Sequence, residues 1–275
     1  MRCAVLGDPI DHSLSPVIHR AAYAELGLVD WSYDAELVSA GHLAAYVDRL
    51  DPGEWRGLSL TMPLKREAVP LLDSHDEWVA ATGACNTVLL EPDGTRRGLN
   101  TDVTGALAVL DEDDATVERA VVLGGGATAT SVLLALAERG MRRATLAVRY
   151  PDRAADTVHA VTAHGSAPAV EVVPLAGVTV LTGDILVSTV PASVQTPEVV
   201  AAVADVPVVF DVVYEPWPTP LAAAAQRSGR TAHSGLDLLV AQAVGQVGAM
   251  TGRSDVPVDA MRRAAEAELA ARESR

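Results

Sequence analysis

The sequence predicts an α/β protein of two domains, in which strands and helices alternate from one end of the chain to the other. Three observations support this prediction. Short runs rich in β-branched residues recur along the chain, and stretches with helical periodicity separate them. A glycine-rich turn directly follows one of these runs and opens a helix. The 275 residues are enough for two ordinary domains.

The composition indicates a globular protein that acts on small molecules. Hydrophobic residues make up 49% of the chain and charged residues 21%, close to globular averages. The net charge of −15 argues against nucleic acid as a partner, because a phosphate backbone needs a basic surface. No apolar run approaches the roughly 20 residues of a membrane span, and the N-terminus enters a strand at once, without a signal peptide. We therefore expect a cytoplasmic protein.

Cys3 and Cys85 are the only cysteines in the sequence. Two cysteines are too few for a disulfide framework, and these two lack the spacing of a metal site. Because free cysteine is usually buried, both are predicted to be reduced, buried thiols rather than reactive groups. No ligand cluster with metal spacing is visible elsewhere in the sequence, so no metal is expected.

The first hundred residues alternate between predicted strands and helices. Helical stretches are expected after Ser15, Ala40 and Pro63, and Ser15-Pro16 is typical of a helix start with serine as N-cap. Asp93-Gly94 lies between apolar runs and predicts a hairpin turn. The predicted strands span residues 3–6, 31–36, 57–60 and 86–90, and the sheets are expected to be largely parallel.

After residue 120 the alternation becomes regular and predicts a doubly wound sheet. An acidic segment over residues 111–118 precedes it, and we place a domain boundary near this segment, with a helix over 102–110 as connector. Two helices close the chain, one over 235–250 with an apolar stripe and one from about Pro257. The predicted strands span residues 121–123, 144–148, 170–173, 185–188 and 206–211.

The glycine-rich turn predicts a dinucleotide site. It reads Leu123-Gly124-Gly125-Gly126-Ala127-Thr128-Ala129 and satisfies the pattern G-x-G-x-x-A between a strand and a helix. Glycines let the backbone approach a pyrophosphate, and the free N–H groups of the helix start bind its charge. A glycine-rich turn without a ligand is the simpler interpretation, but the strand–turn–helix context favours cofactor binding.

The end of the next strand indicates which dinucleotide is bound. NAD-binding proteins usually place an acidic residue here, which bonds the ribose hydroxyls. In this chain the position holds Arg149, and Arg153 follows a turn later. Guanidinium groups suit a ribose 2′-phosphate, so the sequence favours NADP. Asp152 could instead pair with either arginine.

Lys65 is the only lysine in the sequence, and the other 20 basic residues are arginines. A position that needs only positive charge would, in this chain, be an arginine. A lysine can lose and regain its proton, whereas an arginine in a protein does not. We also expect Lys65 at a helix start after Pro63, where the helix dipole disfavours a cation. Lys65 is therefore predicted to be a catalytic acid–base residue rather than a surface lysine.

Six motifs, in this order along the chain, resemble those of the shikimate dehydrogenase family, and the resemblance covers nearly the whole sequence. Three lie before residue 90, one opens the helix over 102–110, and two lie after residue 210. They are His12-Ser13-Leu14-Ser15-Pro16, Thr61-Met62-Pro63-Leu64-Lys65, Gly83-Ala84-Cys85-Asn86-Thr87, Asn100-Thr101-Asp102, Asp211-Val212-Val213-Tyr214, and Gly235-Leu236-Asp237-Leu238-Leu239-Val240-Ala241-Gln242.

The resemblance implies an NADP-dependent oxidoreductase that reversibly reduces the ring ketone 3-dehydroshikimate to shikimate. It implies a substrate domain at residues 1–101, completed by the C-terminal helices at 236–275, and a Rossmann-type NADP domain at 102–235. In the reductive direction the Lys65 ammonium would protonate the developing alkoxide. Asp102 would orient the hydroxyl and the ammonium and balance the charge.

The resemblance also implies the remaining site residues. Ser13 and Ser15 would hold the substrate carboxylate, and Asn86, Asp102 and Gln242 would bind the ring hydroxyls. Gly235 would allow close approach of the nicotinamide. The full substrate set is Ser13, Ser15, Ser59, Thr61, Asn86, Tyr214 and Gln242, and the full cofactor set is Gly124, Gly125, Gly126, Ala127, Thr128, Arg149, Arg153, Thr189, Val190, Val213 and Gly235.

Simpler interpretations and related functions stay open at this point. Ser15 and Asn100 are good helix caps, and Gln242 could be a solvated helix residue. Ser59 stands where the family usually has asparagine, so its contact with the substrate could run through water. The rival functions are a quinate/shikimate dehydrogenase, an aminoshikimate dehydrogenase, and a catalytically silent NADP-binding paralogue. Ser15 favours shikimate over quinate, and the Lys65–Asp102 pair speaks against a silent protein.

Overall fold

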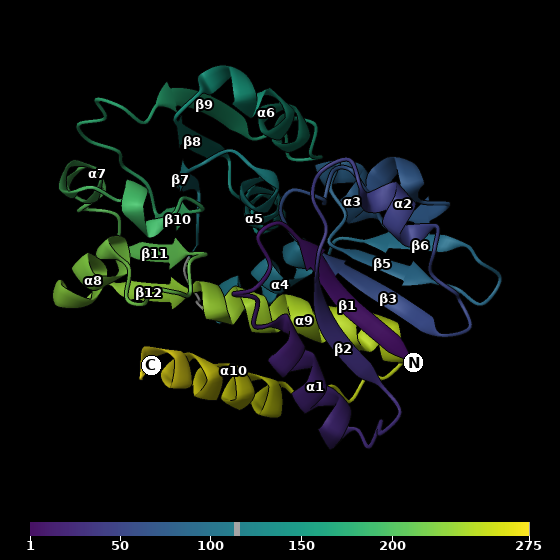
Figure 1. The fold of residues 1–275 in the computed structure, drawn as a ribbon. Helices are drawn as coiled ribbons and strands as arrows, with labels where there is room; N and C mark the ends of the chain where they lie inside the picture. The colour runs from purple at the N-terminus through teal and green to yellow at the C-terminus, as the bar shows by residue number, and fades with distance from the viewer. Residues whose placement is uncertain (113–115, 275) are drawn as a thin grey trace. The chain divides into compact units, whose positions relative to one another are not determined.

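The structure, a computed structural model, describes residues 1–112 and 116–274 and divides into two compact units (Figure 1). The first unit comprises Met1–Gly105 and Leu239–Arg275, and the second comprises Ala106–Leu238. The divisions fall within two helices, α4 (Thr101–Leu110) and α9 (Gly235–Thr251). Part of the acidic segment at which the sequence places a boundary, residues 113–115, lies outside the described residues.

The first unit is built on a six-stranded mixed sheet with the order β2-β1-β3-β5-β6-β4. β5 runs antiparallel to both of its neighbours, and the other pairs are parallel. β5 and β6 form the predicted hairpin, and Gly94 in its turn has a φ of +85°, which favours glycine. The strands are β1 (Arg2–Gly7), β2 (Ser32–Leu37), β3 (Trp55–Leu60), β4 (Ser74–His75), β5 (Thr87–Leu90) and β6 (Arg96–Leu99).

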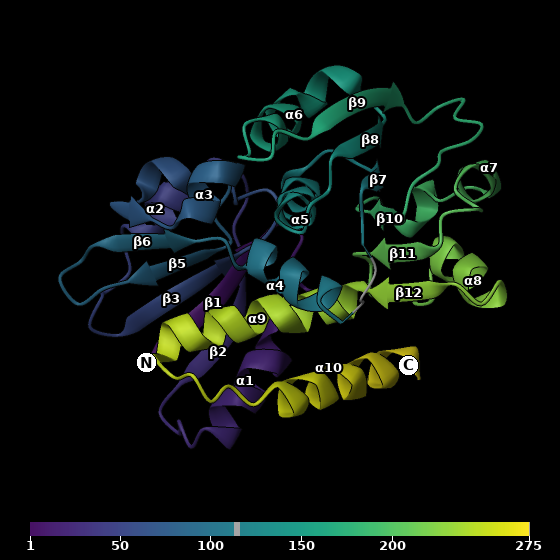
Figure 2. The same ribbon diagram turned by 180° about the vertical axis from the view of Figure 1, so that it is seen from behind.

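The C-terminal helices pack onto this sheet and its first helix, which confirms that part of the predicted fold. The Arg56 Nε on β3 donates to the Met250 carbonyl near the end of α9, at 3.1 Å. α10 (Val258–Glu273) lies beside α1 in both views (Figures 1 and 2). The other helices of the unit are α1 (Ser15–Glu25), α2 (Leu43–Val47), the 3₁₀ helix η1 (Val69–Leu71) and α3 (Glu77–Thr82).

The second unit is the predicted doubly wound domain. Its six strands are all parallel, in the order β12-β11-β10-β7-β8-β9, the arrangement of a Rossmann-type sheet. The strands are β7 (Arg119–Leu123), β8 (Arg143–Val148), β9 (Ala169–Pro174), β10 (Ile185–Ser188), β11 (Val208–Asp211) and β12 (Thr231–Ser234). The helices are α5 (Ala127–Glu138), η2 (Pro151–Ala154), α6 (Ala155–Thr162), η3 (Ala192–Val194), α7 (Pro197–Ala202) and α8 (Pro220–Arg227).

Two local predictions are wrong. No α-helix starts after Pro63: the chain forms consecutive turns, closed by Leu64 N–H donating to the Thr61 carbonyl at 2.8 Å, before η1. The helix dipole therefore gives no argument about Lys65. Ser15 is not an N-cap either, because it is the first residue of α1 and makes no capping side-chain hydrogen bond. The Ser13 hydroxyl instead accepts from the Ser15 N–H at 3.3 Å.

Both cysteines are free and buried, as the sequence predicts. Burial raises the pKa of Cys3 to about 11 and that of Cys85 to about 12. The thiols therefore stay protonated near neutral pH, which makes them poor nucleophiles. Among the described helices, none is both long enough and apolar enough for a membrane crossing.

Candidate active site

Lys65 and Asp102 form a close ion pair in the first unit. The Lys65 Nζ donates to the Asp102 Oδ2 at 2.5 Å, and the two side chains are 15% and 8% exposed. The turn that carries the lysine is tied to the sheet, because the Cys85 N–H donates to the Lys65 carbonyl at 2.7 Å. Asp102 lies in the first turn of α4, where the Asn100 Oδ1 accepts from its N–H at 3.1 Å and caps the helix. Both partners are therefore held by main-chain contacts.

Asn86 completes the surroundings of the carboxylate. Its Nδ2 donates to the Asp102 Oδ1 at 2.9 Å, so each carboxylate oxygen accepts from a different side chain. The Asn86 Oδ1 accepts from the Thr101 N–H at 2.9 Å. Because a backbone N–H can only donate, this contact fixes which end of the amide faces Asp102.

Gln242 reaches the same group from α9. Its Oε1 lies 3.4 Å from the Asn86 Nδ2, and its Nε2 donates to the Leu239 carbonyl at 2.8 Å. A glycine permits this approach: a Cβ on Gly105 of α4 would lie 2.8 Å from the Gln242 backbone nitrogen. The structure thus brings Lys65, Asp102, Asn86 and Gln242 together in one buried polar group.

Ser59 lies deeper than the sequence suggests. It is 3% exposed, and both capacities of its hydroxyl are used. It accepts from the Tyr33 hydroxyl at 2.6 Å and donates to the Gln246 Oε1 at 2.9 Å. The neighbouring predicted residue, Thr61, is partly exposed, and its N–H pairs with the Leu6 carbonyl of β1. Of these two, only Thr61 has exposed surface to offer a ligand.

The other predicted substrate residues belong to different units: Ser13 and Ser15 lie at the start of α1 in the first unit, and Tyr214 lies in the second. The His19 Nδ1 donates to the Ser15 carbonyl at 2.9 Å, and the His19 ring stacks on Tyr33 with 3.9 Å between ring centroids. The two serines are thereby connected through packed side chains to Ser59. Tyr214 belongs to the second unit, between β11 and α8.

The glycine-rich loop of the second unit has the geometry of an anion site. Gly124 has a φ of +104°, and a Cβ there would lie 2.3 Å from the Thr189 Oγ1, so only glycine fits. That hydroxyl donates to the Leu123 carbonyl at 3.0 Å, which ties β10 to the loop. Gly126 is the N-cap of α5, with nothing within 4 Å of the position of a Cβ. Ala127 and Thr128 follow in the first turn, whose N–H groups are available to a phosphate.

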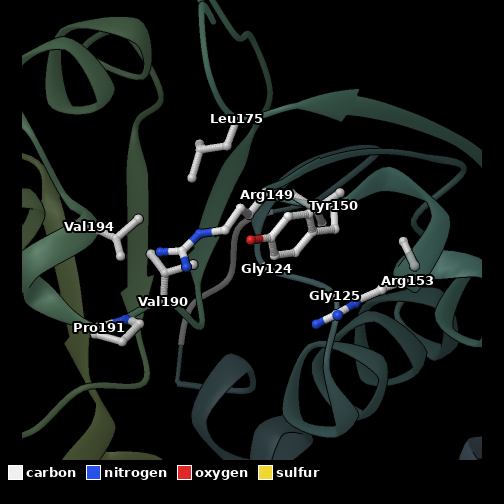
Figure 3. A pocket seen from close by; sticks show the side chains of 11 residues that line it. Gly124, Gly125, Arg149, Tyr150, Arg153, Leu175, Val190, Pro191 and Val194 are labelled. Carbon is white, nitrogen blue, oxygen red and sulfur yellow. The ribbon is translucent and has the colours of Figure 1, made fainter.

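A cavity of about 380 Å³ opens beside this loop (Figure 3). Arg149 and Arg153 project into it, with Tyr150 between them. Within the described chain neither arginine forms an ion pair with a carboxylate, Asp152 included. The cavity is lined by Gly124, Gly125, Val148, Arg149, Tyr150, Arg153, Ala154, Leu175, Val190, Pro191 and Val194. Arg149 and Arg153, which have no carboxylate partner among the described residues, give this cavity a positive charge that favours an anion.

Gly235 has a reason of its own to be glycine. A Cβ there would lie 2.0 Å from the Val212 carbonyl oxygen, and the Gly235 N–H donates to the Val213 carbonyl at 3.3 Å. The strand-end segment Asp211–Val213 is anchored by Asp211, which accepts from Gln195 and Thr219 at 2.7 Å each. Burial raises the pKa of Asp211. The chain's own packing thus explains this glycine without a cofactor.

Three residues beyond the predicted set belong to these sites. Gln246 and Tyr33 hold Ser59, and Tyr150 is 54% exposed in the cavity between the arginines. Gln246 follows Gln242 by one helical turn, which is a signal that the sequence does contain. Tyr33 has no such signal, because its contact with Ser59 depends on the pairing of β2 and β3 with β1.

Comparisons with known proteins agree on one family. Residues 5–88 match the family model of the shikimate dehydrogenase substrate binding domain. A shikimate dehydrogenase (NADP(+)) of Moorella thermoacetica is 38% identical over 272 residues, 94% of this chain and 90% of the relative. The crystal structure of Mycobacterium tuberculosis shikimate dehydrogenase has a TM-score of 0.87 at 38% identity, covering 97% of this chain and 99% of that chain. The quinate dehydrogenase of Corynebacterium glutamicum in complex with NAD has a TM-score of 0.86 at 27% identity, covering 96% and 98%.

Proposed function

Because the chain belongs to the shikimate dehydrogenase family, we propose that it catalyses the reversible, NADP-dependent reduction of 3-dehydroshikimate to shikimate, a step of chorismate and aromatic amino-acid biosynthesis. One observation carries this proposal: the Lys65 ammonium is paired with a carboxylate that accepts on both oxygens. Such a lysine has a fixed position and a proton to exchange, which is what reduction of a ketone requires of a protein.

The proposed chemistry divides between the cofactor and the chain. Bound NADPH supplies a hydride to the carbonyl carbon of the substrate. The Lys65 ammonium donates the proton that the developing alkoxide needs, and in the oxidative direction the Lys65 amine accepts the hydroxyl proton. Asp102 accepts from both Asn86 and Lys65. It therefore orients the amine and balances the charge of its protonated form.

Substrate recognition is assigned to the first unit, with one addition from the second. We assign Ser13 and Ser15 to the substrate carboxylate at the start of α1, where the free N–H groups of the helix favour an anion. Asn86, Asp102 and Gln242 are assigned to the ring hydroxyls, with Thr61 and Tyr214 as further contacts. Ser59 is assigned an indirect role, because Tyr33 and Gln246 already use its hydroxyl.

The residues of the second unit fit NADP. The pyrophosphate is assigned to the N–H groups of Gly125, Gly126, Ala127 and Thr128, and Arg149 and Arg153 to the ribose 2′-phosphate. Arginines without a carboxylate partner suit a doubly charged phosphate, whereas a NAD site normally offers a carboxylate to the ribose. Val190 lies in the lining of the same cavity, and Thr189, Val213 and Gly235 are assigned to the remainder of the cofactor site.

We also propose a cytoplasmic enzyme that acts as a monomer or a homodimer without nucleic acid. The net charge of −15 supports the last point, since it would repel a phosphate backbone. Two free, buried cysteines support a reducing compartment.

The proposed function is tested by initial rates of the purified protein with shikimate or quinate, each with NADP or NAD. We expect shikimate with NADP to give the highest kcat/KM. Quinate carries an additional tertiary hydroxyl beside its carboxylate, and a buried polar group without a partner costs about 1–3 kcal/mol. If kcat/KM for quinate equals that for shikimate, the enzyme is a quinate/shikimate dehydrogenase instead. If NAD is used as well as NADP, Arg149 and Arg153 do not bind a ribose 2′-phosphate.

A further inference from the structure

Six buried side chains in the first unit form one continuous line of hydrogen bonds that ends on Asp102. The Tyr33 hydroxyl donates to Ser59 at 2.6 Å, and Ser59 donates to the Gln246 Oε1 at 2.9 Å. The Gln246 Nε2 donates to the Thr87 Oγ1 at 3.1 Å, and Thr87 donates to the Asn86 Oδ1 at 2.8 Å. The Asn86 Nδ2 then donates to the Asp102 Oδ1 at 2.9 Å.

Every bond in this line points the same way, and the chemistry of its ends explains why. Tyr33 has one proton to give, and Ser59 and Thr87 each have one, so a hydroxyl that accepts from one neighbour must donate to the next. The carboxylate at the other end has only acceptors when ionised. Two backbone groups fix the amides independently: the Asn86 carbonyl accepts from the Gln246 Nε2 at 3.3 Å, and the Thr101 N–H donates to the Asn86 Oδ1. The line therefore has a single consistent arrangement.

The line joins elements that lie far apart in the sequence. Tyr33 comes from β2, Ser59 from β3, Gln246 from α9 and Thr87 from β5. All four are at most 3% exposed, so water does not compete for their hydrogen bonds. Buried polar groups of this kind destabilise a fold unless all are satisfied, and here each has its partner.

We propose that Tyr33, Ser59, Thr87 and Gln246 are positioning residues, which hold Asn86 and through it Asp102 in the geometry that the reaction needs. The proposal deepens the function proposed above and rests on it. Ser59 then acts on catalysis through Gln246 and not by touching the substrate. A change at Tyr33, Ser59, Thr87 or Gln246 should lower kcat, because the reacting groups are displaced, and should leave KM nearly unchanged.

The test is steady-state kinetics of Tyr33→Phe, Ser59→Ala and Thr87→Val with shikimate and NADP, with thermal melts of each variant. We expect kcat to fall by about tenfold for Thr87→Val and by about threefold to fivefold for the other two, with the loss decreasing with distance from Asp102. Thr87→Ser, which keeps the hydroxyl, should restore most of the kcat lost in Thr87→Val.

The chain offers a matched control in Tyr23. Tyr23 is buried like Tyr33, and both rings pack against the ring of His19. The Tyr23 hydroxyl makes no hydrogen bond to any member of the line, and the polar group beside it is the Cys3 thiol. Tyr23→Phe should therefore leave kcat unchanged. A purely structural role for the line would lower the melting temperatures of the variants without a loss of kcat in the fraction that is folded, and would overturn the proposal.

A double-mutant cycle separates the two ways in which Ser59 could act. If Ser59 acts through the line, Tyr33→Phe adds little to the kcat loss of Ser59→Ala, because the line is already broken. If Ser59 touches the substrate, Ser59→Ala raises KM and the Tyr33→Phe effect adds to it, which contradicts the proposal. If the unmodified enzyme does not oxidise shikimate, the proposed function is refuted. The line can then still be tested by denaturant unfolding: the effects of Tyr33→Phe and Ser59→Ala on the free energy of unfolding should not be additive if the two side chains are hydrogen-bonded.

Discussion

In the first unit the side chains around Asp102 are hydrogen-bonded to one another, whereas in the second unit Arg149 and Arg153 form no ion pair within the described residues and lie over the ring of Tyr150. The guanidinium carbons lie 6.0 and 4.8 Å from the centroid of that ring. In the first unit Asn86, Asp102 and Gln242 are buried, and the amides of Asn86 and Gln246 each have one fixed orientation. The arginines of the second unit are exposed. Proton transfer needs a geometry that is set before the substrate binds, while a phosphate can itself order the cations that bind it.

The largest loss of kcat is expected at Lys65 and Asp102, whose side chains are held by hydrogen bonds. Lys65→Arg keeps the positive charge but removes the exchangeable proton, and Asp102→Asn removes the charge that holds the ammonium. Each should reduce kcat by about 10²–10⁴-fold, with KM changed far less. The measurement is steady-state kinetics, with NADP binding and thermal melts as controls for folding. A Lys65→Arg enzyme that kept more than about a tenth of kcat would show that the side chain only binds charge.

The burial of His19 in the first unit should make the free energy of unfolding depend on pH. His19 is fully buried, and burial lowers its pKa from 6.5 to about 4. The unfolded chain binds a proton at this residue below pH 6.5 and the folded chain does not until about pH 4. As the pH is lowered from 6.5 to about 4, the free energy of unfolding should therefore fall by about 3 kcal/mol because of His19 alone.

His19→Gln should remove that part of the decline, so that its free energy of unfolding depends less on pH between 6.5 and 4. Denaturant unfolding at several pH values measures the difference. His75→Gln replaces an exposed histidine and serves as the control for the exchange of histidine for glutamine itself. Identical slopes for His19→Gln and the unmodified protein would show that the interior admits a proton or water.

Substitutions at the arginines of the second unit should change the preference between NADP and NAD and should not abolish the reaction. Arg149→Asp should weaken NADP binding by about tenfold to a hundredfold, because a charge-assisted hydrogen bond to phosphate contributes about 1.5–3 kcal/mol. NAD binding should change little. Arg143→Asp, at the opposite end of β8, is the matched control and should leave both affinities unchanged. Equal losses for NADP and NAD would place the 2′-phosphate elsewhere.

The smallest effect is expected at Tyr150. Its ring lies between the two guanidinium groups, and each cation–π contact at an exposed site contributes about 0.5–1 kcal/mol. Tyr150→Leu, which removes both contacts, should thus weaken binding of 2′,5′-ADP by about fivefold to thirtyfold, while Tyr150→Phe should not. Calorimetry with 2′,5′-ADP and with 5′-AMP measures both. If 5′-AMP lost as much affinity, the ring would contact the base and not the arginines.

Much of the fold could be predicted because its strands are apolar runs bounded by turn residues. β7, β8 and β10 are short apolar strands of this kind, and Gly124 follows β7 directly. β4 was not predictable, since Ser74–His75 has two exposed residues and no pattern. The sequence after Pro63 predicts a helix in place of these turns because proline is also common at the first position of a helix.

The site divides in the same way. The motifs around Lys65, Asn86, Asp102 and Gln242 are local in sequence, and the structure brings their side chains together. The partners of Ser59 could not be predicted. The hydrogen bond from Ser59 to Gln246 joins residues 187 positions apart, and that from Tyr33 depends on strand order. The periodicity of apolar residues along the sequence predicts helices and strands, but it does not predict either of these two long-range hydrogen bonds.

The central claim is that the chain uses a nicotinamide hydride and the Lys65 proton to reduce a ring ketone. The most direct measurement is the reduction of 3-dehydroshikimate with NADPH that carries deuterium in place of both hydrogens at C4 of the nicotinamide, followed by NMR of the product. The account predicts shikimate with deuterium on the carbon that held the ketone, formed by the unmodified enzyme and at a rate lower by about 10²-fold or more by Lys65→Arg. Product without deuterium on that carbon, or the same rate from Lys65→Arg, would contradict it.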